Sequence, residues 1–132
     1  MENLKEDTNK KPSILLVEDD PLLVTMYKTK FTHEGFDILI ANDGQTGLKM
    51  AMEEEVDLIL LDIMMPRLSG IDLLEALRNT PKGKKIPVII ATNLSGEEDK
   101  QKAQKLGVND YLIKVNITPT ELVSKIRRDI KS

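Results

Sequence analysis

Five polar side chains follow short apolar runs, at the points where buried strands are expected to end. They are Glu18, Asp19, Asp62, Thr92 and Lys114. Because the carboxyl ends of parallel strands meet at one edge of an α/β sheet, where such sheets bind ligands, we expect these side chains to lie close together. Three carboxylates in close contact repel one another unless a cation lies among them. A hard divalent ion such as Mg²⁺, which prefers oxygen ligands, meets that requirement.

The same cluster is suited to holding a phosphoryl group. Lys114 adds a second positive charge and Thr92 adds a hydroxyl donor, and both stabilise an oxyanion. A carboxylate can accept a phosphoryl group covalently when a metal ion and a lysine stabilise the charge in transit. We therefore interpret Asp62 as the phosphoryl acceptor. By its position alone, Lys114 could also be an ordinary edge-strand lysine whose amine reaches solvent.

Asp62 has the most informative position of the five. The continuous apolar run at residues 58–61 is typical of a strand buried on both faces, and Asp62 follows it at once. Pro66 favours an extended conformation at Met65, and no helical pattern begins directly after Asp62. This context argues for a site residue and against a helix N-cap.

Short apolar runs alternate with longer amphipathic segments from Ile14 onward. Strands are predicted over residues 14–17, 36–41, 58–61, 87–91 and 111–115, with Thr92 ending the fourth and Lys114 near the end of the fifth. A helix is predicted after each strand. This alternation is typical of βαβ units, so we predict an α/β fold with a doubly wound, five-stranded parallel sheet and five helices.

Cap residues predict where the helices begin. The predicted N-caps are Asp20 (before Pro21), Ser69, Ser95 and Thr118, with Glu98 and Glu121 completing two capping boxes, and Asn42-Asp43-Gly44 is predicted to open the second helix. Asp20 is therefore better explained as a cap than as a metal ligand.

Two helices have features that weaken them. The acidic run at residues 53–55 opposes the dipole at the end of the second helix, which predicts fraying there. The fourth helix, closed by Gly107, has an apolar stripe of little more than Ala103 and Leu106. A helix that buries so little is free to shift.

Composition limits the class of protein. The 132 residues suit one domain, predicted over residues 13–132 behind a flexible charged tail at residues 1–12. The absence of cysteine excludes a disulfide, a thiol nucleophile and a thiolate metal site. No apolar run approaches the length of a membrane span, which predicts a cytoplasmic protein. The net charge of −3 gives no argument for direct nucleic-acid binding.

Four motifs together resemble a known family. They are ILLVEDD at residues 14–20, LDIMMP at 61–66 followed by Gly70, PVIIAT at 87–92 and GVNDYLIK at 107–114. In this order and at these spacings they resemble the receiver domains of bacterial two-component response regulators, over nearly all of residues 14–130. Because the sequence ends soon after the fifth helix, we expect a stand-alone receiver similar to the chemotaxis regulators.

The resemblance implies a phosphorylation site. Asp62 would take a phosphoryl group from the phosphohistidine of a sensor histidine kinase or a phosphotransfer protein. The implied Mg²⁺ ligands are Glu18, Asp19, Asp62 and the backbone carbonyl of Met64.

The resemblance also implies a switch. Thr92 would move to the phosphoryl group, Tyr111 would change rotamer, and Lys114 matches the lysine of the family's site. The sheet order would be 2-1-3-4-5, as in flavodoxin-like folds. The output surface would consist of the last two helices and the strand between them, where a downstream protein would bind. The domain would be a monomer or a phosphorylation-dependent dimer.

Two features depart from the family's pattern. Val115 stands where the family usually has a proline, often after a cis bond, and a cis bond to a non-proline residue costs roughly 2.5–4 kcal/mol. We therefore predict a trans Lys114-Val115 bond and a locally altered loop. Met64 and Leu94 occupy the two positions that commonly tune dephosphorylation, and neither side chain can hydrogen-bond an attacking water. This predicts a long-lived phosphorylated form.

The leading interpretation is a signalling switch that is not an enzyme, because its only chemistry is its own phosphorylation and hydrolysis. Three other functions are possible alternatives. An aspartyl-phosphate phosphatase would need a catalytic acid at the position of Met64. A phosphorylation-independent scaffold usually lacks one of the acids, the threonine or the lysine, all of which are present in this sequence. A flavin-binding domain would need a Gly/Ser/Thr-rich loop after the first strand, and the sequence has none there.

Overall fold

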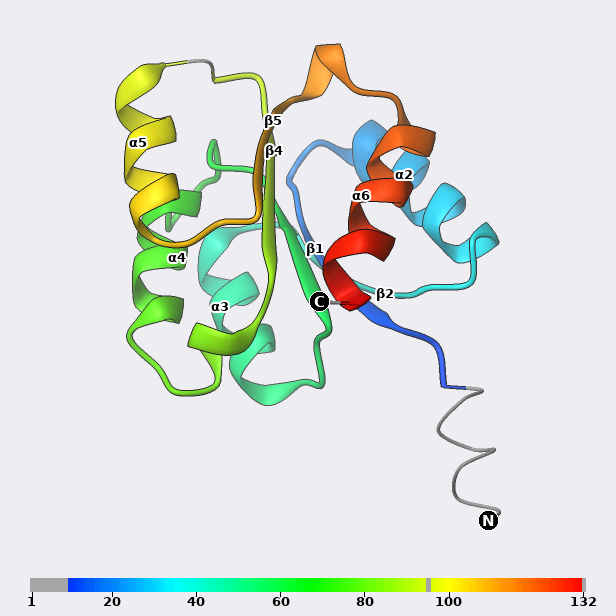
Figure 1. The fold of residues 1–132 in the computed structure, drawn as a ribbon, viewed down its shortest axis with the longest axis horizontal. Coiled ribbons are helices and arrows are strands. Elements are labelled where there is room, and N and C mark those ends of the chain that lie inside the picture. Colours follow the sequence, from blue (N-terminus) through cyan, green and yellow to red (C-terminus); the bar gives the residue numbers. More distant parts are fainter. Residues whose placement is uncertain (1–9, 95, 132) are drawn as a thin grey trace.

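Five parallel strands form one sheet in the order β2-β1-β3-β4-β5, which confirms the predicted order (Figure 1). The strands are β1 (Ser13–Val17), β2 (Asp37–Ala41), β3 (Leu58–Leu61), β4 (Val88–Thr92) and β5 (Asp110–Ile113). This computed structural model describes residues 10–94 and 96–131, except for the side chain of Lys131. Residues 1–9 of the predicted tail therefore lie outside the described residues.

Helices cover both faces of the sheet. They are α2 (Pro21–His33), α3 (Gly44–Glu53), α4 (Gly70–Arg78), α5 (Glu97–Lys105) and α6 (Pro119–Lys131), with 3-10 turns η1 (Gly83–Lys85) and η2 (Lys114–Asn116). Helices α3, α4 and α5 pack on one face and α2 and α6 on the other, which gives three layers (Figure 1). None of the helices in the described residues has the length and apolar character that a bilayer span requires.

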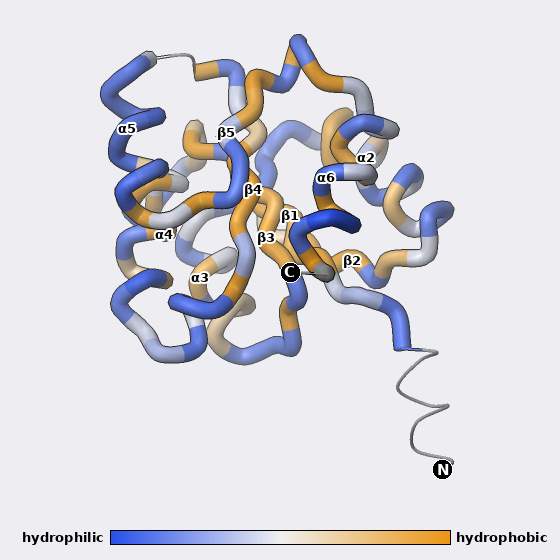
Figure 2. Tube along the Cα trace, in the orientation of Figure 1, coloured by the Kyte–Doolittle hydropathy of each residue, from blue (hydrophilic) through white to orange (hydrophobic). Residues whose placement is uncertain are grey.

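The central strands are buried on both faces. Every residue of β3 and β4 is buried, which explains why their sequences are continuous apolar runs rather than alternating ones. Along β1, Leu15 and Val17 pack with the α3, α4 and α5 face, whereas Ile14 and Leu16 pack with the α2 and α6 face. Figure 2 shows hydrophobic residues concentrated in the strands and hydrophilic residues along most of α5.

Local caps determine several helix starts. Asp20, Asp43 and Ser69 each accept a backbone N–H bond in the first turn of α2, α3 and α4. At the start of α6, the amide of Thr118 donates to Glu121 at 3.0 Å and the amide of Glu121 donates to the Thr118 hydroxyl at 3.1 Å. The predicted caps Asp20, Ser69 and Thr118 are confirmed, and the structure adds Asp43.

Helix α5 begins at Glu97, and its N-cap is Gly96, which makes no side-chain cap bond. The predicted capping box begins at Ser95, which lies outside the described residues. The other end agrees with the prediction, because Gly107 adopts a φ of 77° directly after the C-cap residue Leu106.

The fifth strand is shorter than predicted. β5 ends at Ile113, which pairs with Thr92, the last residue of β4, so the ladder has no further partner strand to continue along. Residues Lys114–Asn116 form the 3-10 turn η2 instead. Lys114 therefore lies just beyond the ladder, where its side chain is no longer held to the alternation of a strand.

A lysine from a distant loop caps the end of α3. Lys82 Nζ donates to the carbonyl oxygens of Met52 and Glu54, at 3.0 and 2.7 Å. Its positive charge also complements the helix dipole beside the acidic run at residues 53–55. The prediction of fraying overlooked this contact, because no local sequence pattern indicates it.

Replacing Lys82 by Met is expected to lower the free energy of unfolding by about 0.5–1 kcal/mol, because α3 loses a cation and two hydrogen bonds at its C-terminal end. Urea unfolding followed by circular dichroism measures the change. Lys84→Met is the matched control, since Lys84 is an exposed lysine of the same loop. An equal loss in both variants would contradict the capping role.

Candidate functional site

The sheet order brings the predicted site residues to one edge. Strands β1 and β3 are neighbours, with Val17 in register with Leu61, so the residues that follow them come side by side. The amide of Asp62 donates to the carbonyl of Val17 at 3.0 Å, which continues the ladder to the acid itself. Glu18 and Asp62 are therefore held next to each other by backbone pairing.

Three carboxylates gather at this edge, as the sequence predicted. Carboxylate oxygens of Glu18, Asp19 and Asp62 all lie within 4.8 Å of one another. Glu18 and Asp62 are buried, whereas Asp19 is exposed, so the cluster is open to solvent on one side. Oxygen ligands of this kind at this spacing fit a hard divalent cation such as Mg²⁺, reached from the Asp19 side.

Lys114 bridges two of the three acids. Its Nζ lies 2.6 Å from Glu18 Oε1 and 2.7 Å from Asp62 Oδ2, and its side chain is only 9% exposed. The lysine follows β5, so its side chain passes the end of β4 to reach acids that follow β3 and β1. These contacts exclude the alternative of an edge-strand lysine whose amine reaches solvent.

Backbone amides hold the other oxygens of these two acids. Asp20 N donates to Glu18 Oε2, and Met64 N donates to Asp62 Oδ1, each at 3.1 Å. Among the described residues, no buried side-chain nitrogen or oxygen lacks a hydrogen-bond partner. The charge of the cluster is not balanced, because three carboxylates face one ammonium group and leave a net negative charge.

Burial and hydrogen bonding in the site shift the pKa values of Glu18 and Lys114. Burial raises the pKa of the Glu18 carboxyl and outweighs the hydrogen bonds and positive charge that lower it. Burial opposes the charge on Lys114, but its bonds to Asp62 and Glu18 dominate and raise its pKa. Lys114 therefore remains a cation at neutral pH, whereas Glu18 takes up a proton at a higher pH than a free glutamate would.

Thr92 and Tyr111 both form hydrogen bonds with the backbone of Leu94. Thr92 is fully buried at the end of β4, and its Oγ1 accepts a bond from Leu94 N at 3.2 Å. The Tyr111 hydroxyl donates to the carbonyl of Leu94 at 2.8 Å. The two predicted switch residues are thus joined through one residue, which the sequence had singled out only for its side chain.

A glycine sets the shape of the loop after Asp62. A Cβ at Gly70, the first residue of α4, would lie 2.5 Å from both the Asp62 carbonyl oxygen and the Ile63 Cα. Only glycine therefore allows α4 to begin this close to the acid. Met64, in the same loop, has a side chain that is 56% exposed.

Comparison with known proteins identifies the family of this chain. The sequence model of the family described as response regulator receiver domain matches residues 14–127, a range that includes the whole cluster. The chain belongs to this family. It is a receiver domain of two-component systems, so the resemblance of the four motifs is confirmed.

Similar proteins agree with this assignment. The transcriptional regulatory protein CpxR of Escherichia coli (strain K12) is 42% identical over 114 residues, which is 86% of this chain and 47% of CpxR. The receiver domain thus spans about half the length of that relative. The CheY-like response regulator receiver domain protein from Methanospirillum hungatei JF-1 superposes with a TM-score of 0.86 and 26% identity, over 92% of this chain and 95% of that chain. The receiver domain of the sensor histidine kinase PA1611 from Pseudomonas aeruginosa PAO1 has a TM-score of 0.84 and 29% identity, over 93% and 100% of the two chains.

The peptide bond after Lys114 differs from the family's usual pattern, as predicted. Every peptide bond in the described residues is trans, so the predicted trans Lys114-Val115 bond is confirmed. Val115 is 79% exposed within the turn η2.

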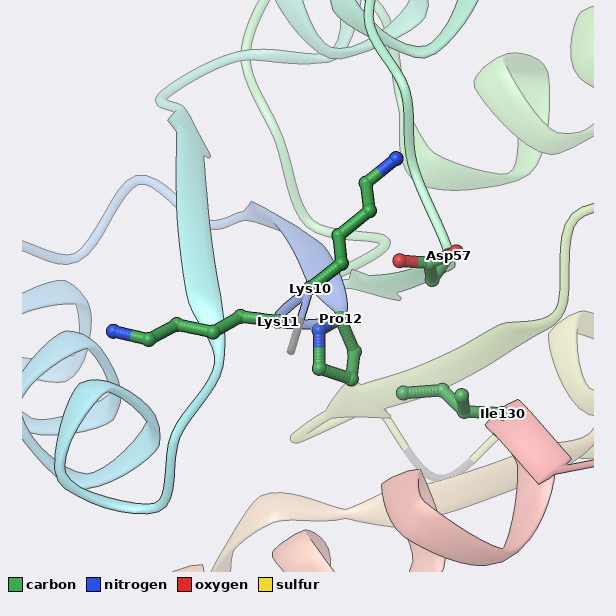
Figure 3. Close-up of a pocket in the computed structure, with 5 residues that line it drawn as sticks. All are labelled: Lys10, Lys11, Pro12, Asp57 and Ile130. Carbon is green, nitrogen blue, oxygen red and sulfur yellow. The ribbon is translucent and has the colours of Figure 1, made fainter. Parts of the chain in front are cut away.

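A separate hollow of about 220 Å³ lies at the opposite, amino-terminal edge of the sheet, far from the site residues. It is lined by Lys10, Lys11, Pro12, Asp57 and Ile130. Figure 3 shows the Lys11 side chain pointing away from Asp57, so its polar groups do not converge on a common point. The acidic cluster, where charged side chains do converge, is therefore the stronger candidate site.

Replacing Lys114 by Met is expected to tighten Mg²⁺ binding by roughly tenfold. The ammonium group now occupies the acids that would hold the ion, and a unit charge a few ångströms away costs more than about 1.4 kcal/mol at an effective dielectric constant of about 20. Isothermal titration calorimetry with MgCl₂ measures the dissociation constant, with circular dichroism to verify folding. Lys84→Met serves as the control, and unchanged or weaker binding in Lys114→Met would contradict the competition.

Proposed function

We propose that this receiver domain is a Mg²⁺-dependent phosphorylation switch in which Asp62 accepts a phosphoryl group from the phosphohistidine of a sensor histidine kinase or phosphotransfer protein. The observation that carries the proposal is the buried Asp62, with Lys114 Nζ at 2.7 Å and two further acids within 4.8 Å. A reactive carboxylate, a fixed cation and a set of oxygen ligands for a second cation meet at one point.

The proposed transfer is a single displacement. A carboxylate oxygen of Asp62 attacks phosphorus, the phosphorus–nitrogen bond of the phosphohistidine breaks, and the imidazole nitrogen leaves with the bonding electron pair. Glu18 and Asp19 would hold the magnesium ion, which when bound supplies positive charge to the phosphoryl oxygens. Lys114, which bonds both Glu18 and Asp62, supplies a second, fixed positive charge.

Thr92 is suited to stabilise the product. Its Oγ1 accepts the bond from Leu94 N, so its own hydroxyl proton remains available to a phosphoryl oxygen. Tyr111 is bonded to the same residue, which supports a linked response of both side chains. The proposed output surface is α5, β5 and α6, with a downstream protein as its partner and a monomer or a phosphorylation-dependent dimer as the assembly.

A solved relative supports the choice of metal. The receiver domain of the sensor histidine kinase PA1611 has a magnesium ion coordinated in its active-site cleft. The acidic cluster of this chain offers carboxylate oxygens, which Mg²⁺ prefers as ligands. We propose that Glu18, Asp19, Asp62 and the Met64 carbonyl fill that role here.

Exposed apolar side chains support a protein as the phosphoryl donor. Leu22, Met64 and Val115 are 82%, 56% and 79% exposed. Each lies within four residues of a cluster residue, so they surround the site from the start of α2, the loop after β3 and the turn η2. Exposed apolar groups around a charged centre are typical of a protein-binding surface.

Incubation with acetyl phosphate tests the proposal directly. We expect one phosphoryl adduct by intact mass when Mg²⁺ is present, and none without Mg²⁺ or in Asp62→Asn, because the amide is not a nucleophile. Calorimetry verifies that the protein binds Mg²⁺ under the same conditions. No adduct in protein that binds Mg²⁺ would overturn the switch and favour a phosphorylation-independent scaffold.

The lifetime of the adduct tests the roles of Met64 and Leu94. We propose that the phosphorylated form is long-lived, because neither side chain can orient an attacking water. Met64→Asn introduces such a group and is expected to speed phosphate loss by about tenfold or more. Met26→Asn, at an exposed methionine of α2, is the matched control. Rapid loss from the unmodified protein with Mg²⁺ present would contradict this role.

A further inference from the structure

The packing of α5 is confined to its C-terminal half. None of residues 97–102 is buried, whereas Ala103 is fully buried and Leu106 and Val108 pack against the same core cluster. At the start of the helix, the N-cap Gly96 makes no side-chain bond. Apolar contact therefore holds one end of α5 to the domain and leaves the other end exposed.

Arg78 fastens the same C-terminal end by hydrogen bonds. Its Nε donates to the Leu106 carbonyl at 2.8 Å, and Nη2 donates to the Gly107 carbonyl at 3.1 Å. Its Nη1 donates to the carbonyls of Gly83 and Ile86, before β4. One guanidinium group at the end of α4 thus joins the last carbonyls of α5 to the loop that leads into the sheet, where a cation also suits the helix dipole.

The other helix of the proposed output surface is fastened differently. Arg127 of α6 donates to both the carbonyl and the carboxylate of Glu34, at the end of α2, and its guanidinium lies 4.9 Å from the ring centre of Phe36. Arg128 pairs with Asp110 at the start of β5. In addition to these ties, α6 buries Leu122, Val123 and Ile126 against the core, so its packing runs along the helix, whereas the ties of α5 lie at one end.

The exposed end of α5 is the end that the site can reach. Leu94, two residues before the N-cap Gly96, bonds through its amide to Thr92 and through its carbonyl to Tyr111. Leu94, just before α5, therefore shares hydrogen bonds with both proposed switch residues.

We propose that Arg78 is a positioning residue that fixes the C-terminal end of α5, so that phosphorylation moves the N-terminal end of α5 about this fixed point while α6 stays in place. The inference rests on the proposed function and narrows its output surface to the N-terminal half of α5. Arg78 acts through the carbonyls of Leu106 and Gly107 and does not contact the phosphoryl group.

Residue-level amide hydrogen exchange of the full chain tests the fixed point without phosphorylation. Arg78→Lys keeps the charge but cannot span four carbonyls, and we expect exchange at residues 103–108 to quicken at least tenfold. Arg127→Lys, an equal change on α6, should leave α5 unaffected. Unchanged exchange at 103–108 in a folded Arg78→Lys variant, or an equal effect of Arg127→Lys there, would overturn the role of Arg78.

A second measurement, with Mg²⁺ and beryllium fluoride as a phosphoryl analogue, tests the movement. We expect exchange to change at residues 97–101 and to stay constant at 105–108 and in α6, whereas in Arg78→Lys the change should spread to 105–108. A response of equal size along all of α5, or none despite formation of the adduct, would overturn the proposed movement. Failure to form the adduct would contradict the proposed function and the movement with it, while the first measurement would still decide the role of Arg78.

Discussion

The structure depends on the repulsion among three carboxylates at one edge of the sheet. Glu18 and Asp62 are placed side by side by the pairing of β1 with β3, and their burial makes each unbalanced charge expensive. Lys114, which follows β5, relieves part of that cost for both acids. The remaining negative charge is what the proposed magnesium ion would balance, and a buried ion pair of this kind is weak evidence of a stabilising role.

Several structural details follow from holding these charges in place. Gly70 lets α4 begin against the Asp62 carbonyl, and the amides of Asp20 and Met64 hold the oxygens that Lys114 does not. The end of β5 at Ile113 frees Lys114 to leave the strand. Each of these features sets the position of a charged group, and together they leave little freedom in the site except on the exposed Asp19 side.

Flexibility is distributed in the opposite way to burial. Glu18, Asp62 and Lys114 are buried and hydrogen-bonded, whereas α5 has a single buried side chain, Ala103. Leu94 lies between these two regions and shares its amide and carbonyl with Thr92 and Tyr111. A rigid site beside a weakly packed helix is the combination that lets a local change in charge become a displacement of a surface, because the local free energy of opening is low where few contacts are buried.

Much of this architecture can be predicted from the sequence, because its causes are local. The continuous apolar runs of β3 and β4 indicated buried parallel strands, and short-range hydrogen bonds made Asp20, Ser69 and Thr118 readable as caps. The acids and the threonine could be placed at one edge because strand ends determine their position. The contacts between segments distant in the chain could not be predicted in this way. The bonds of Lys82 to α3, of Arg78 to the end of α5 and of Lys114 to two acids each join residues whose partners lie mostly far away in sequence. Long side chains can reach many partners, and the packing of the three layers selects which one they meet.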